Sequence, residues 1–204
     1  MEPFDELVTR RNRLQKLIGQ GIEPYPSRSH RTYDIGVVLA SFPTLINSAK
    51  EICVAGRIVA RRAHGGSTFI NLDDGEGKIQ IYAKIDEIGQ PAYDDLELLD
   101  VGDFIEIIGS AFVTKKGEPT ILVKEPVRIL AKSLRPLPEK WHGLVDTELR
   151  YRQRYLDFLA NPQTVQLAKS RSKMVAAMRA FFDSEGFLEV ETPVLQPLAG
   201  GAAA

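Results

Sequence analysis

Hydrophobic and polar residues alternate with a period of two through the middle of the chain, from residue 51 to residue 129. The apolar positions are rich in Ile, Val and Phe, which suit strands that bury one face. Turn-forming residues separate the runs, as at Gly65-Gly66 and Lys116-Gly117. The pattern predicts a short helical insert over 94–99 and five strands, which are residues 52–54, 68–72, 78–83, 103–113 and 120–129.

Five strands with a helical insert between the third and the fourth are typical of an OB-fold barrel. A five-stranded sandwich of another kind is the alternative that the pattern leaves open. Gly56 and Pro126 indicate bulges, where the alternation between buried and exposed faces changes. The pattern therefore does not fix the faces of the first and fifth strands.

Helical spacing of apolar residues appears on both sides of this region. Residues 3–20 predict an amphipathic helix, and residues 34–41 predict a second, shorter one. Further helices are expected over residues 147–159 and 162–185, followed by a short strand that ends in Thr192-Pro193. The fold class is therefore expected to be mostly β with α.

Two residues mark the expected start of the last helix. Asn161 is a common N-cap, and Pro162 suits the first helical position. Before the third helix, Pro136 and Pro138 hold a linker extended. We expect four parts: a helical extension (1–50), the barrel (51–133), the linker (134–146) and the start of a second domain (147–204).

Composition and charge narrow the function only slightly. The formal net charge of −1 gives no global case for nucleic-acid binding. Cys53 is the single cysteine, which excludes an internal disulfide framework, and its apolar neighbours predict a buried structural thiol. No apolar run approaches the roughly 18 residues of a membrane span, and the N-terminus has no secretory core. We expect a soluble, cytoplasmic protein with no membrane partner, and its three scattered histidines predict no metal site.

The predicted strands carry a candidate binding surface. If the isoleucines of the second and third strands face inward, Phe69, Asn71, Gln80 and Tyr82 face outward. An exposed ring beside amides is how an OB-fold holds single-stranded nucleotides. Arg61-Arg62 follow the first strand and offer guanidinium groups to RNA. The alternative is that Phe69 packs under a loop or a helix and the arginines are only solvated.

The end of the chain carries a longer signature. Gly186 to Pro193 reads Gly-Phe-Leu-Glu-Val-Glu-Thr-Pro after a long helix and resembles motif 1 of the class II aminoacyl-tRNA synthetases. The linker, the run Arg-Tyr-Arg-Gln-Arg-Tyr-Leu-Asp (150–157) and Gly-Gly-Ala-Ala-Ala (200–204) resemble the lysyl-tRNA synthetase family in particular. Aspartyl and asparaginyl synthetases share the barrel, so they are the nearest alternative.

For the barrel, the resemblance implies an anticodon-binding domain. It implies that Phe69 stacks on a central anticodon uridine and that Gln80 and Arg62 contact the same base. It also implies that Glu125 helps to define a uridine-rich triplet, although a length difference near Pro126 disturbs the register there.

For the second domain, the resemblance implies a homodimer interface with Pro193 at the contact between subunits. Gly200, Gly201 and Ala202 would begin a loop of the amino-acid pocket. The full-length family joins lysine to tRNA(Lys) with ATP and Mg²⁺, using arginines of motifs 2 and 3, which are not in this sequence.

From this we expect no catalytic residues among the 204, and no complete binding of ATP and Mg²⁺. A polypeptide of this sequence alone is expected to bind an anticodon stem-loop but not to form lysyl-adenylate. The alternative from another class is a free-standing OB-fold RNA-binding or regulatory module.

Overall fold

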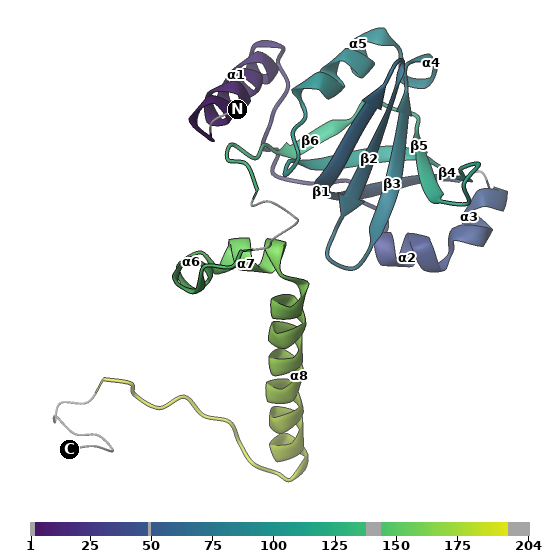
Figure 1. Cartoon of the computed structure of the whole chain (residues 1–204). Coiled ribbons are helices and arrows are strands. Elements are labelled where there is room, and N and C mark those ends of the chain that lie inside the picture. The colour runs from purple at the N-terminus through teal and green to yellow at the C-terminus, as the bar shows by residue number, and fades with distance from the viewer. Residues whose placement is uncertain (1–2, 49, 138–143, 196–204) are drawn as a thin grey trace. The chain divides into compact units, whose positions relative to one another are not determined.

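The structure, a computed structural model, describes residues 3–48, 50–137 and 144–195. The chain divides into two compact units, residues 1–137 and residues 138–204 (Figure 1). The first unit contains a closed barrel built from β1 (Glu51–His64), β2 (Ser67–Asp73), β3 (Lys78–Lys84), β4 (Phe104–Val113), β5 (Pro119–Val123) and β6 (Arg128–Ala131).

The barrel closes because β1 pairs with two strands. The strand order is β1-β2-β3-β5-β4-β6, and an additional pairing joins β1 to β4. Neighbouring strands are antiparallel except for β3 and β5, which run parallel. Closure confirms the OB-fold over the five-stranded sandwich of another kind that the pattern had left as an alternative.

The expected first strand, residues 52–54, was much too short. β1 runs for 14 residues, pairing with β4 over residues 51–57 and with β2 over residues 57–64. A bulge between Ile58 and Ala60 bends the strand between its two partners. At Gly56 the backbone of Asp73 approaches so closely that an added Cβ would lie 3.0 Å from its carbonyl oxygen.

The expected fifth strand, residues 120–129, is interrupted. Its two segments, β5 and β6, both pair with the continuous strand β4. Between them residues 124–127 face only residues 107–108 of β4. Pro126, which has no N–H to donate, lies in this break. β5 and β6 therefore act as one strand with an irregular middle, which preserves the five-stranded plan.

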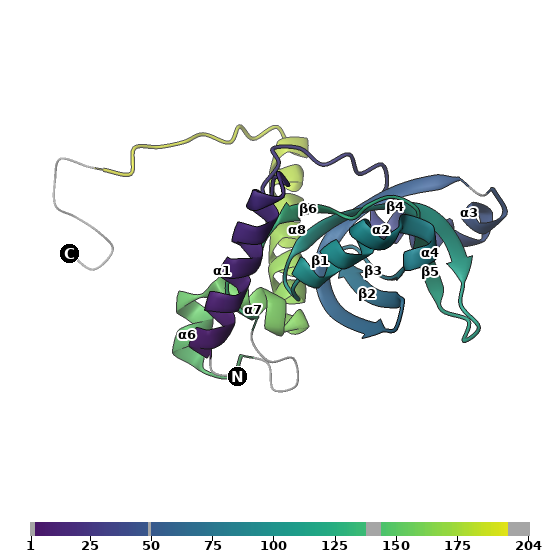
Figure 2. The same cartoon turned by 90° about the horizontal axis from the view of Figure 1, so that it is seen from above.

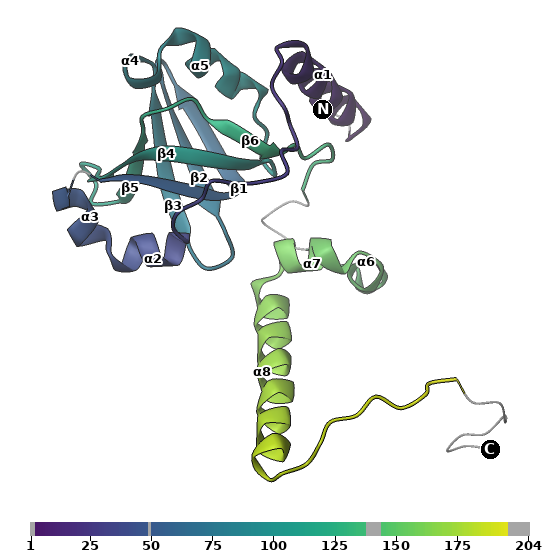
Figure 3. The ribbon, with the colours of Figure 1, turned by 180° about the vertical axis from the view of Figure 1, so that it is seen from behind.

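Side chains from all the strands fill the barrel. The inward isoleucines of β1 to β5 are completely buried: Ile58, Ile70, Ile81, Ile105, Ile107 and Ile121. Cys53 is also buried, as expected. Short helices cover the two ends of the barrel (Figures 1 and 3): α2 (Ile35–Ala40) and α3 (Phe42–Ser48) at one end, and α4 (Ile85–Ile88), α5 (Gln90–Asp94) and the 3₁₀ helix η1 (Asp95–Leu98) at the other.

The N-terminal helix α1 (Pro3–Gly19) lies beside η1 and the chain that follows β6 (Figures 1 and 2). Leu17 anchors it in the core. Arg10 is 4% exposed and donates to the carbonyl oxygens of Val101 and Ser133, each at 3.0 Å. These two hydrogen bonds join residues that are far apart in the sequence, and they hold α1 against the barrel.

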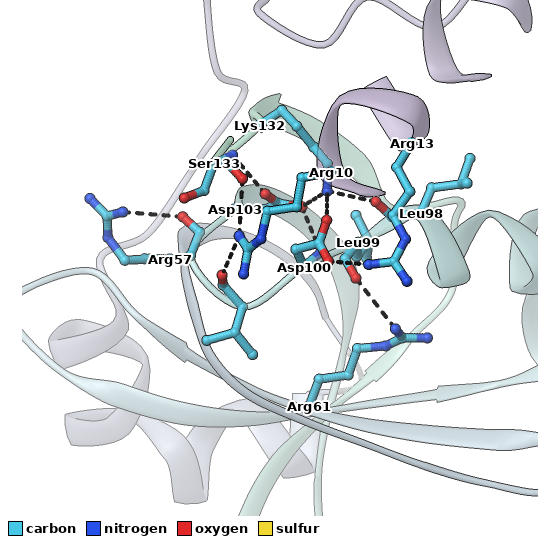
Figure 4. A network of polar contacts seen from close by, with 12 residues as sticks. Arg10, Arg13, Arg57, Arg61, Leu98, Leu99, Asp100, Asp103, Lys132 and Ser133 are labelled. Carbon is cyan, nitrogen blue, oxygen red and sulfur yellow. Dashed lines mark hydrogen bonds and ion pairs between the residues drawn. The ribbon is translucent and has the colours of Figure 1, made fainter. Parts of the chain in front are cut away.

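A buried ionic cluster, drawn in Figure 4, lies at the same end of the barrel. Lys132 Nζ donates to Asp103 Oδ2 at 2.6 Å, to Asp100 Oδ2 at 2.5 Å and to the carbonyl oxygen of Leu98 at 2.7 Å. Asp103 also accepts from the backbone N–H groups of Asp100 and Ser133, each at 2.7 Å. The cluster ties β6 to the turn before β4.

The second unit begins with two short helices, α6 (Thr147–Arg152) and α7 (Arg154–Ala160), rather than the single expected helix over residues 147–159. The long helix α8 (Pro162–Ser184) follows them. Gln153 separates α6 from α7, because its backbone φ of −121° is not helical. The short strand expected before Thr192-Pro193 is absent from the described residues, because residues 187–195 have no neighbouring strand with which to pair.

The buried carboxylate of Asp157 joins the three helices. It accepts hydrogen bonds from Arg150 Nε at 2.8 Å and from Asn161 Nδ2 at 2.6 Å, and it pairs with Arg154. Burial alone would raise its pKa, but these hydrogen bonds outweigh burial and lower the pKa to about 2. The sequence predicted that Asn161 caps α8. Asn161 does occupy the N-cap position, but its side chain donates to Asp157 and makes no capping hydrogen bond.

Candidate nucleic-acid interface

The strand register places a continuous row of side chains across the outer face of the barrel. Arg62 lies opposite Phe69, Phe69 opposite Tyr82, and Tyr82 opposite Leu122. Residues between these positions along β2 and β3, such as Ile70 and Ile81, are fully buried in the core. The alternation inferred from the sequence is therefore confirmed for these two strands.

Aromatic rings form the centre of this row. The rings of Phe69 and Tyr82 stack with centroids 4.6 Å apart and an interplanar angle of 24°. Tyr82 in turn contacts Phe112 of β4, at 6.0 Å and 50°. Phe69 and Tyr82 are both partly exposed. The stack holds Phe69 in a fixed orientation and presents a flat apolar surface of the kind on which nucleobases stack.

Gln80 lies beside the aromatic row, but it is far less exposed than the sequence suggested. Only 7% of its surface is accessible, because Glu118 and Thr120 cover it. Its Nε2 donates to Glu118 Oε2 at 2.8 Å, and its Oε1 accepts from Thr120 Oγ1 at 3.1 Å. The amide is therefore held in one orientation, with its donor end turned to a carboxylate.

The two adjacent arginines of β1 have different surroundings. Arg62 is exposed, and within the described residues its guanidinium makes no hydrogen bond or ion pair. Arg61 lies opposite the core residue Ile70 and turns to the end of the barrel, where it donates to the carbonyl oxygen of Leu99 at 3.3 Å. Arg62 is thus the arginine that shares the aromatic face.

Within the described residues, no contact connects Glu125 to the aromatic row. It lies in the break between β5 and β6, it is exposed, and within the described residues it forms no hydrogen bond or ion pair. Its proposed role stays a prediction. The carboxylate that does touch Gln80 is Glu118, which sequence reasoning missed. Its only signal was its place between the hairpin glycine, Gly117, and the first residue of β5.

The remaining candidate residues belong to the second unit. Pro193 lies in the described part of the chain and is exposed, whereas Gly200, Gly201 and Ala202 lie outside the described residues. Across the described ranges there is no group of three or more His, Cys, Asp or Glu side chains that could hold a metal ion. Within the same ranges, every helix is too short or too polar to cross a bilayer.

Helix α8 presents large apolar side chains to solvent. Among the described residues, Leu167, Met174, Met178 and Phe181 are each more than half exposed. Their spacing of three, four and seven residues puts them along one side of the helix. Apolar stripes of this kind are typical of surfaces that pack against another polypeptide segment.

Comparisons with known proteins agree with this division. A family model described as an OB-fold nucleic acid binding domain matches residues 52–130, and one described as tRNA synthetases class II (D, K and N) matches residues 146–204. The lysine–tRNA ligase of Pelotomaculum thermopropionicum is 48% identical over 204 residues, which is all of this chain and 40% of that protein.

Other relatives give the same picture. The lysine–tRNA ligase of Carboxydothermus hydrogenoformans is 49% identical over the whole chain and 41% of its own length. That of a Roseiflexus species is 48% identical over 94% of the chain and 40% of its own length. The chain therefore spans about two fifths of the length of the curated relatives that it matches.

Proposed function

We infer that this chain, which belongs to the lysine–tRNA ligase family along its whole length, binds the anticodon loop of tRNA(Lys) on the outer face of its barrel. The observation that carries this proposal is the stacked pair Phe69–Tyr82 beside the oriented amide of Gln80. A base that stacks on Phe69 would gain about 1–3 kcal/mol from that contact.

The polar groups beside the rings suit a uracil edge. Uracil presents one N–H donor flanked by two carbonyl acceptors, and the amide of Gln80 offers both a donor and an acceptor. In the free protein the hydroxyl of Thr120 donates to the amide oxygen of Gln80, and the amide nitrogen donates to the carboxylate of Glu118. We propose that the base replaces the contact with Glu118, whose carboxylate is then free to accept the uracil N–H. Arg62 is the cation placed to approach the same nucleotide, and Glu125 stays a candidate for a neighbouring one.

An RNA hairpin carrying the anticodon loop with a central uridine tests this proposal. Phe69→Ala should weaken its binding about tenfold or more, since the stacking surface is lost. Gln80→Ala should weaken it several-fold, and that loss should shrink when the central uridine is replaced by cytidine. The measurement is fluorescence anisotropy of the labelled hairpin at fixed salt.

The matched control is Phe158→Ala, which removes an exposed aromatic ring from α7 in the other unit. It should leave hairpin affinity unchanged. If Phe69→Ala and Gln80→Ala also leave affinity unchanged, the outer face of the barrel has only a structural role.

We further propose that the whole protein containing this chain activates lysine with ATP and Mg²⁺ and transfers it to tRNA(Lys) in the cytoplasm. The described residues include no group of three or more His, Cys, Asp or Glu side chains that could hold Mg²⁺, and no step of that chemistry is assigned to them. The exposed side of α8, with Pro193 beyond it, is proposed to pack against a second copy of the protein in a homodimer.

The expected result for the whole protein is lysine-dependent exchange of pyrophosphate into ATP, because relatives named lysine–tRNA ligase are 48% and 49% identical to this chain over its whole length. Aspartate and asparagine should support no exchange. Exchange that depends on aspartate instead of lysine would place the protein with the aspartyl-type relatives and overturn the assignment.

A further inference from the structure

A second polar site lies at the end of the barrel, away from the aromatic row. A cavity of about 550 Å³ lies between α1, η1 and the end of β1, and its polar lining includes Asn12, Arg13, Lys16, Arg61 and Glu97. Figure 4 shows the guanidinium groups of Arg13 and Arg61 on the same side of Asp100. Three cations from two distant parts of the sequence therefore meet around one space.

Arg61 is incompletely satisfied in this cavity. Its Nε is buried and has no hydrogen-bond partner among the described residues, and its one hydrogen bond, to the carbonyl oxygen of Leu99, is long at 3.3 Å. Burial lowers the pKa of Arg61, and the neighbouring charge of Arg13 lowers it further. Two cations placed together with an unpaired donor are stabilised when an anion binds between them.

The charge of the lining indicates what kind of anion fits. Asp100 already pairs with Arg13 and with Lys132. Within the part of the chain that the structure describes, Lys16 and Arg61 are then the lining cations with no carboxylate in ion-pair contact. Glu97 on the rim offsets part of their charge. The lining therefore keeps a small positive excess, which attracts a phosphate group, and each phosphodiester of an RNA strand brings one negative charge.

We propose that this cavity binds one phosphodiester group of the RNA strand whose bases lie against Phe69. This inference rests on the proposed function, because it adds a contact to the same bound RNA. The two sites share β1: Arg61 faces the cavity, and the next residue, Arg62, lies opposite Phe69. A strand that crosses the end of β1 would therefore reach both sites, with its base on one face and its backbone at the other.

Lys16→Gln is the test variant, because Lys16 is exposed and the substitution leaves the buried contacts of α1 intact. It should weaken binding of the anticodon hairpin about fivefold near 0.1 M salt and lower the slope of log K against log salt by about 0.7. Arg11→Gln is the matched control. Arg11 lies on the same helix, is exposed, does not line the cavity and carries the same charge, so its effect should be much smaller.

Hairpins with a single neutral methylphosphonate locate the contact. The loss caused by Lys16→Gln should disappear on one of them, because the phosphate that Lys16 binds has lost its charge. The loss of affinity caused by Arg61→Gln should disappear on the same modified hairpin. The double variant should lose less binding free energy than the sum of the two single variants.

Three outcomes would overturn the proposal. Lys16→Gln could match Arg11→Gln, its loss could persist on every modified hairpin, or it could weaken binding of inorganic phosphate while leaving RNA binding unchanged. The last result would assign the cavity to a free anion. If Phe69→Ala still weakens hairpin binding in these cases, the proposed function stands and only the phosphate site fails.

Discussion

Lys132→Met is expected to lower the free energy of unfolding of the barrel unit by about 3–5 kcal/mol, because it leaves the buried carboxylate of Asp103 without its cation and leaves Asp100 with Arg13 alone. The Lys132 side chain is fully buried and donates to Asp100, Asp103 and a backbone carbonyl. Methionine fills a similar volume, so the loss is electrostatic and not a cavity effect. Hydrogen exchange of the barrel amides measures the change as a free energy of opening.

The matched control is Lys78→Met, which removes an exposed lysine paired with Asp73 at 3.3 Å. An exposed pair of this kind contributes about 1 kcal/mol or less. A loss for Lys132→Met no larger than that of Lys78→Met would contradict the prediction. Adding Asp103→Asn to Lys132→Met should restore part of the stability, because it removes the buried charge that lost its partner.

The pH dependence of this variant follows from Asp103. Burial raises the pKa of Asp103, and the hydrogen bonds from Lys132 and from two backbone N–H groups act against that rise. Without Lys132 the pKa rises further. A carboxyl with a raised pKa in the folded state favours folding at acid pH and loses that contribution as pH rises through the folded pKa. The destabilisation should therefore be smallest near pH 4 and grow toward neutrality.

The parts of the fold that were predicted best from the sequence are set by residues that lie close together along the chain. The alternation along β2 and β3 placed Ile70 and Ile81 inward and Phe69 and Tyr82 outward, because a strand exposes its faces with a period of two. Turn residues such as Gly65 located the hairpins, because a tight turn also depends on adjacent residues. Where one face is buried, this local pattern also fixes the register.

The features that sequence missed depend on segments that are far apart in the chain. Closure of the barrel needs β1 to leave β4 and join β2 at Arg57, just before the bulge beyond Ile58. Gly56 indicated an irregularity in this strand, but it gave no sign that the strand changes its partner there. The parallel pairing of β3 with β5 puts Thr120 opposite Gln80, and it thereby brings Glu118 onto the amide. Without that pairing, Gln80 looked freely exposed and Glu118 looked like an ordinary turn residue.

The basic cavity was missed for a similar reason. Arg13 and Arg61 are 48 positions apart, and the first appeared only as part of the polar surface of a helix. Docking of α1 by Arg10 and Leu17 brings the two guanidinium groups to one space. Spacing along the chain carries no signal for such a site, whereas the unpaired Nε of Arg61 reveals it in the structure.

Gly109→Ala is expected to be the other strongly destabilising change, because β4 and β5 approach too closely at this residue to admit a side chain. An added Cβ would lie 2.1 Å from the carbonyl oxygen of Leu122 and 2.9 Å from Ile121 Cγ2. The first contact is with backbone and the second is with a fully buried core residue, so neither can move aside alone. We expect a loss of about 3 kcal/mol or more, at the upper end for overpacked sites.

The same substitution should reach the RNA face, because β5 carries Thr120, which holds the amide of Gln80. Displacement of β5 should speed hydrogen exchange of its amides first and weaken binding of the uridine hairpin as well. Gly19→Ala is the control, since a Cβ there meets nothing within 4 Å, and alanine in a helix is about 1 kcal/mol more favourable than glycine. Unchanged exchange in β5 for Gly109→Ala would show that the barrel accommodates the added methyl group without displacing β5, which would contradict the prediction. If β5 is displaced while binding of the uridine hairpin is unchanged, Thr120 is not what orients Gln80 for RNA, and the selectivity for uridine comes from Phe69 and Arg62.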